Sequence, residues 1–147
     1  MTRFHVVRVL ILATLLLPAA CSRDTDKTET VKCDGNCVIV FKPDAEAGKA
    51  ALNGDDEKEF LDVLADHQRY ADDFKKQLSK SDIKFSESTA RYIIIDNGKT
   101  QTKLDTRHED YMFGVILVKS SAEPEMHHGI FTDMEYQMFA KRYFGKS

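Results

Sequence analysis

The chain has 147 residues, of which 42% are hydrophobic, and a formal charge of −3. This length suits one domain with a single core and excludes a multidomain enzyme. Nine Phe and five Tyr provide ample apolar surface, so a wholly disordered chain is excluded as well. The acidic balance argues against sequence-independent nucleic-acid binding, which needs clustered Lys and Arg at the phosphates.

The N-terminus has the layout of a signal peptide. Arg3 and Arg8 flank the start of an apolar run of nine residues, 9–17, which small residues and Cys21 follow. Nine residues fall far short of the roughly 20 that span a bilayer as a helix, so a permanent membrane anchor is the weaker interpretation. We expect residues 1–20 to be removed. Their loss takes away two basic residues and no acidic one, which changes 21 basic and 24 acidic residues into a mature charge of −5.

Ala19 and Ala20, directly before Cys21, resemble the lipobox of bacterial lipoproteins, in which a dedicated peptidase cuts before a lipid-modified cysteine. The resemblance implies that Cys21 carries lipid such as palmitate. An ordinary secreted protein cleaved at a small-x-small site is the alternative, but it leaves Cys21 unexplained. Similarity to lipoprotein sorting in double-membraned bacteria implies, from Ser22 after the cysteine, an outer-membrane protein of the cell envelope that faces the periplasm.

The segment after Cys21 is polar and mixed in charge. Because residues 22–31 have almost no apolar side chains to bury, they cannot offset the entropy cost of ordering. We therefore expect a flexible, lipidated tether over residues 21–32. A single domain is expected to follow over residues 33–147.

Cys33 and Cys37 flank an Asp-Gly-Asn turn. Such a turn can fold back and bring the two cysteines within disulfide range in an oxidising compartment, so we expect a disulfide. The alternative is a copper site, to which Met126, His127 and His128 add soft or imidazole ligands. The expected mature protein holds no metal and no other cofactor.

Three segments have clear secondary-structure signals in the first half of the chain. A β-branched apolar run at residues 38–42 predicts a strand, and residues 43–54 predict a loop or one loose helical turn. From Asp55 to about Lys80, apolar positions recur at spacings of four and three, which predicts one long amphipathic helix. Acidic residues in its first turns and lysines at its end match the helix dipole.

The second half of the chain predicts mostly strands. Residues 91–96 and 99–104 flank an Asn-Gly pair and predict a hairpin, since both turn residues accept positive φ. Residues 111–119 predict a long central strand, with Gly114 at a bulge or a close packing point. A short strand is expected at residues 128–131.

A capping box formed by Thr132 and Glu135 predicts the start of a second helix, which ends near Phe144. Phe131 and Tyr136 suit the hydrophobic staple beside it. The predicted fold is α+β: a four- or five-stranded, mainly antiparallel sheet covered on one face by one long and one short helix.

No local signature of a hydrolase, zinc protease or nucleotide-binding protein occurs, so we expect no enzymatic activity. The polar segment 105–110 has the residue types of an acid/base pair or a metal site, but a solvated hairpin loop is the simpler interpretation. His67 lies on the apolar stripe of the long helix, which predicts a partly buried structural histidine. His127 and His128 are adjacent in a strand and point to opposite faces, so they do not readily bind one metal ion.

Acidic residues crowd the long helix and predict a surface for a protein partner, although a solvated helix face has the same composition. The residues that we predict to contact a partner are Asp55, Asp56, Glu59, Asp62, Asp66, Met126, His127 and His128.

These observations favour a protein-binding module. Small outer-membrane lipoproteins that inhibit a lysozyme-like or other toxic wall-targeting protein are similar in size, address and lack of catalytic motifs, which is an analogy of layout. Many such toxins are basic, so an acidic face speeds their capture. We therefore expect an inhibitor or immunity protein. The alternatives are an accessory or assembly lipoprotein of an envelope complex and a copper carrier that uses Cys33 and Cys37.

Overall fold

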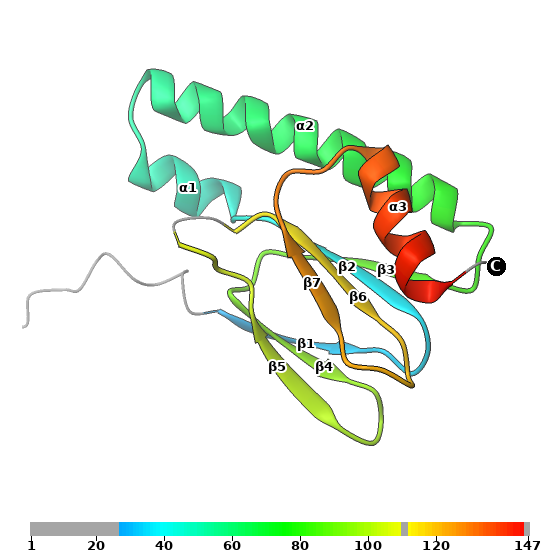
Figure 1. Ribbon diagram of the computed structural model, residues 1–147. Helices are drawn as coiled ribbons and strands as arrows, with labels where there is room; N and C mark the ends of the chain where they lie inside the picture. The colour runs from blue at the N-terminus through cyan, green and yellow to red at the C-terminus, as the bar shows by residue number, and fades with distance from the viewer. Residues whose placement is uncertain (1–26, 110–111, 146–147) are drawn as a thin grey trace, which may run out of the picture.

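The computed structural model describes residues 27–109 and 112–145, which fold into three layers (Figure 1). Within these ranges, no helix has the length and apolar character needed to cross a membrane. The elements in chain order are β1 (Thr28–Lys32), β2 (Cys37–Phe41), α1 (Ala45–Ala51), α2 (Asp55–Leu78), β3 (Lys84–Ser88), β4 (Tyr92–Asp96), β5 (Gln101–Asp105), β6 (Gly114–Val118), β7 (Glu125–His128) and α3 (Asp133–Phe144).

The strands form two sheets. One has the order β3-β2-β6-β7 and the other the order β1-β4-β5. β1 pairs parallel with β4 and β2 parallel with β3, whereas the other three pairs are antiparallel. The predicted α+β class is confirmed. The expected single sheet of four or five strands is instead two sheets, of three and four strands.

The four-stranded sheet is the middle layer and is covered on both faces (Figure 1). On one face, Val40 and Leu117 pack with Phe74 and Tyr136 from α2 and α3. On the other face, Ile39 and its neighbours pack with the three-stranded sheet. Every residue of β2 and β6 is therefore buried, which explains why these two strands read as continuous apolar runs.

The N-terminal boundary of the domain differs from the expected one. Thr28–Lys32 form β1, so a tether that begins at Cys21 ends before Thr28, and the domain does not begin at Cys33. The physical reason is the pairing of β1 with β4, in which Val31 packs against the core between the sheets. Residues 1–26, with the expected signal peptide and Cys21, lie outside the described residues.

Local signals predicted the C-terminal half well. The predicted hairpin joins β4 and β5, but its connection covers residues 97–100 and only Gly98 of the Asn-Gly pair has a positive φ, so it is not the expected two-residue turn. Thr132 caps α3 with the capping box present. Gly114 is a close packing point, because a Cβ there would lie 2.1 Å from the carbonyl oxygen of His127. The last strand, however, covers Glu125–His128 rather than residues 128–131.

Candidate functional site

Helix α2 has 24 residues, and its two halves have different surroundings. All of its buried residues lie in the C-terminal half: His67, Ala71, Phe74 and Leu78. The N-terminal half runs past the strands and packs beside α1 (Figure 1). The contact there is close, because a Cβ on Gly48 of α1 would lie 2.2 Å from the ring of Phe60. The acidic residues of the predicted surface belong to this projecting half.

Four of these acidic residues form one row, which we call the acidic stripe: Asp55, Glu59, Asp62 and Asp66. Their spacings of four, three and four place them on one side of the helix. At about 100° per residue, this side lies roughly 120° around the helix from the buried residues. All four side chains are exposed. Asp56 is also exposed but lies on another side of α2.

The acidic stripe is largely unpaired. Asp66 forms an ion pair with Arg69, with 3.0 Å between the carboxylate oxygen and the guanidinium nitrogen. Asp55, Glu59 and Asp62 form no ion pair with any described residue. Like charges three or four residues apart on a helix repel one another by a few tenths of a kcal/mol. A cationic group beside the stripe would relieve that repulsion.

The remaining predicted contact residues lie elsewhere, in the edge strand β7. Met126 packs into the core between the two sheets. The His127 ring stacks on Phe139 of α3, with 4.1 Å between ring centroids, and its Nε2 lies 2.5 Å from Glu125. The hydrogen bond from Arg142 is the largest cause of the lowered pKa of Glu125.

His128 lies on the opposite face of β7, where its ring meets Phe41 edge-on at a centroid distance of 5.6 Å. The prediction that His127 and His128 point to opposite faces is therefore confirmed. The structure does not join Met126, His127 and His128 with the acidic stripe into one surface, because β7 lies in the sheet and the stripe faces outward from α2.

His67 is a structural histidine, as predicted, and is fully rather than partly buried. Its Nδ1 lies 3.4 Å from the hydroxyl of Tyr136, and its ring meets Phe113 edge-on. Burial, with a smaller contribution from the charge of Lys42, lowers the pKa of His67 to about 4. The ring is neutral at ordinary pH.

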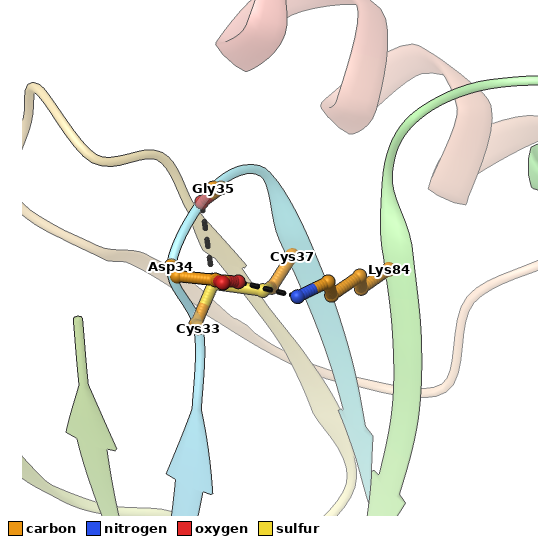
Figure 2. The surroundings of a disulfide bond; sticks show 5 residues. All are labelled: Cys33, Asp34, Gly35, Cys37 and Lys84. Carbon is orange, nitrogen blue, oxygen red and sulfur yellow. Dashed lines mark hydrogen bonds and ion pairs between the residues drawn. A yellow bond between two sulfur atoms is a disulfide. The ribbon is translucent and has the colours of Figure 1, made fainter. Parts of the chain in front are cut away.

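Cys33 and Cys37 are joined by a disulfide, and both residues are buried (Figure 2). The bond links the end of β1 to the start of β2, and therefore one sheet to the other. Asp34 in the turn points toward Lys84 of β3 and forms an ion pair with it, and this hydrogen bond lowers the pKa of Asp34. Because the two sulfurs are bonded to each other, they are not a pair of copper-binding thiolates in this state.

The described part of the polar segment after β5 is mostly exposed, as expected of a solvated loop, except for Thr106. Thr106 is fully buried, and its hydroxyl donates to the backbone carbonyls of Ala90 and Arg91 at 3.0 and 2.9 Å. His108 lies beside His128, with 5.2 Å between ring centroids. Two polar segments that are 20 residues apart in sequence thus meet, which no local sequence signal indicates.

Two further surface features lie outside the predicted site. A pocket of about 410 Å³ is bordered by α1, α2 and the end of β2, with Leu61, Leu64 and Lys42 among its lining residues. On the C-terminal side, the exposed large hydrophobic residues of the described ranges are Ile130, Met134 and Met138, spaced four residues apart. Met134 and Met138 belong to α3, whereas Ile130 precedes it.

No family model, no curated protein and no solved structure matches the chain. In residues 27–109 and 112–145, no group of three or more His, Cys, Asp or Glu side chains is placed to hold a metal ion.

Proposed function

We propose that the protein is a non-catalytic binding module that captures a basic protein partner through the acidic stripe of α2. The main support for this proposal is the row of exposed carboxylates on the projecting half of α2. Three of them, Asp55, Glu59 and Asp62, form no ion pair with any described residue. A toxic, envelope-targeting protein is the partner that suits this surface and the expected location at the outer membrane. The protein then acts as its inhibitor or immunity protein.

Physical chemistry supports this choice of surface. Exposed charges act over a Debye length of about 8 Å at physiological ionic strength, and a row of like charges adds their fields. Complementary charge raises association rates above the ordinary 10⁵–10⁶ M⁻¹s⁻¹ and contributes less to the dissociation rate. The stripe therefore acts mainly by steering the partner toward α2.

The expected lipid on Cys21 completes the proposal. It holds the domain at the periplasmic side of the outer membrane, on the route of any protein that attacks the envelope. Replacing Cys21 by Ser is expected to release the protein from membranes or leave an uncleaved precursor. A correctly cleaved Cys21→Ser protein that stays on the membrane would contradict the lipid anchor.

The binding surface is tested with two variants of equal charge. Glu59→Lys with Asp62→Lys reverses two charges in the acidic stripe, beyond the first helical turn where acids support the helix dipole. Asp82→Lys with Glu123→Lys reverses two exposed charges elsewhere. Full-chain protein captures partners from an envelope extract at low salt, and association rates are then measured for the captured partner.

We expect the stripe variant to associate more slowly than the wild type and the control variant to stay close to the wild type. The difference is expected to shrink as salt is added, because screening shortens the field. Equal slowing in both variants would mean that only the net charge matters, and it would contradict a specific role of the stripe. An unchanged rate in the folded stripe variant would leave the acidic face as solvated surface.

A further inference from the structure

The meeting of His108 and His128 is the second chemical feature of the molecule, and it is independent of the acidic stripe. His108 follows β5 and is exposed, whereas His128 ends β7 and is half-buried. The β6–β7 register pairs Gly114 with His128, which fixes the backbone position of the second imidazole. The two rings are tilted by 37° with their centroids 5.2 Å apart.

The two ring nitrogens of His128 have different surroundings. The ring donates a hydrogen bond to the backbone carbonyl of Thr106, while the buried Nε2 has no hydrogen-bond partner among the described residues. Nδ1 is therefore the donor, and Nε2 carries a free lone pair.

This arrangement matches that of a histidine prepared for a metal ion. Metal-binding histidines usually donate their other N–H to a carbonyl or carboxylate, which fixes the tautomer and the ring orientation. Phe41 packs edge-on against the His128 ring and holds it from another side. A buried polar atom without a partner is rare in folded proteins and commonly marks an ion or a water site.

We propose that His108 and His128 form a binding site for one divalent transition-metal ion with a preference for imidazole, Cu²⁺ above Zn²⁺. With metal–nitrogen distances of about 2.0–2.1 Å, two imidazoles on one ion have ring centroids roughly 4.5 Å apart in square-planar and about 5.2 Å apart in tetrahedral geometry. The 5.2 Å in the structure needs only a small adjustment. His108 can supply it, because its side chain is exposed.

The site differs from a structural zinc centre in its number of ligands. Two protein nitrogens leave the other coordination positions to solvent on the side of the exposed His108, so the ion exchanges and is not needed for folding. Cu²⁺ stands above Zn²⁺ for a given set of nitrogen ligands, which sets the expected order of affinity. The disulfide-bonded Cys33 and Cys37 take no part.

The test measures metal binding by the full chain, without an affinity tag, in detergent and after treatment with a chelator. Calorimetric titration with CuCl₂ and with ZnCl₂ is expected to give one site, tighter for Cu²⁺. His108→Ala, which changes an exposed side chain, is expected to weaken binding by about tenfold or more. His127→Ala is the matched control, because this neighbouring imidazole faces α3, and it is expected to keep the wild-type affinity.

Two further measurements keep the outcome unambiguous. Thermal melts of each variant show that lost binding is not lost folding, and NMR line broadening by Cu²⁺ is expected first at the rings of His108 and His128. The variant with both Cys33→Ser and Cys37→Ser is expected to retain the site, which separates it from a cysteine-based copper carrier. No binding by the wild type, unchanged binding by His108→Ala, or equal loss in His127→Ala would overturn the proposal.

Discussion

The two halves of α2 belong to one uninterrupted helix but have different roles. The C-terminal half lies on the four-stranded sheet, where Phe74 stacks on Tyr136 with 5.2 Å between ring centroids. The N-terminal half carries the acidic stripe and contacts α1, a helix with no buried residue. One amphipathic helix therefore contains a segment buried against the core and a segment that is largely exposed. The two differ because the four-stranded sheet lies under the C-terminal half, whereas only α1 lies beside the N-terminal half.

The largest expected effect is in the C-terminal half. Phe74→Ala removes a buried ring between α2, α3 and β3, so we expect a loss of about 3–5 kcal/mol in the free energy of unfolding. Leu64→Ala in the projecting half is the matched comparison, with an expected loss of about 1 kcal/mol because Leu64 is only half-buried. Urea unfolding of both variants measures the difference. Equal losses would mean that the projecting half is as much a part of the core.

The next largest effect is a pH-dependent change in stability that comes from His67, which lies at the boundary between the two halves of α2. The pKa of His67 is 6.5 in the unfolded chain and about 4 in the folded one. Above pH 6.5 the ring is neutral in both states and has no effect. As the pH falls from 6.5 toward 4, the unfolded chain binds a proton that the folded chain does not, so stability falls by about 3 kcal/mol.

The variant His67→Gln isolates this contribution, because a glutamine does not titrate. The wild type is expected to lose more stability than the variant between pH 6.5 and pH 4, as measured by urea unfolding. Burial also lowers the pKa of His128, so part of the acid sensitivity remains in the variant. Identical pH profiles would refute the burial of a neutral His67.

A smaller effect is expected where α1 supports the projecting half. Gly48→Ala places a methyl group against the Phe60 ring, which costs about 1 kcal/mol at that contact. Since α1 buries no residue, we expect the loss to stay local. Hydrogen exchange should quicken in α1 while the amides of β6 keep their protection. Faster exchange in β6 would show that α1 is coupled to the core.

The smallest effect on stability is expected in the acidic stripe itself. Glu59→Lys with Asp62→Lys changes exposed side chains beyond the first turn, and surface changes of this kind usually stay within about 0.5 kcal/mol. Thermal unfolding checks this expectation. The same variant is expected to slow partner association, as the proposed role of the stripe in binding requires. A large loss of stability would instead make these carboxylates structural.

Local chemistry explains which parts of the fold were predictable. The Asn97-Gly98 pair, the capping box at Thr132 and the apolar run of β6 each specify their element from neighbouring residues. β1 and β3 carry mixed polar sequences and pair in parallel with strands far along the chain, so no short segment indicates them.

The candidate sites follow the same rule. The acidic stripe was predictable, because helical spacing alone places its residues in one row. The pairing of His108 with His128 was not, because it depends on the β6–β7 register and on the buried Thr106 that orders the preceding segment.

The position of β1 also limits the length of the proposed tether between Cys21 and the folded domain. On a chain anchored at Cys21, only the seven residues up to Lys27 separate the lipid from the folded domain, because Thr28 already belongs to β1. Seven residues reach at most about 25 Å when fully extended, against about 40 Å for the twelve residues of the expected tether. With the proposed anchor, the domain would stay within about 25 Å of the bilayer surface, so the proposed partner would have to approach the membrane to be bound.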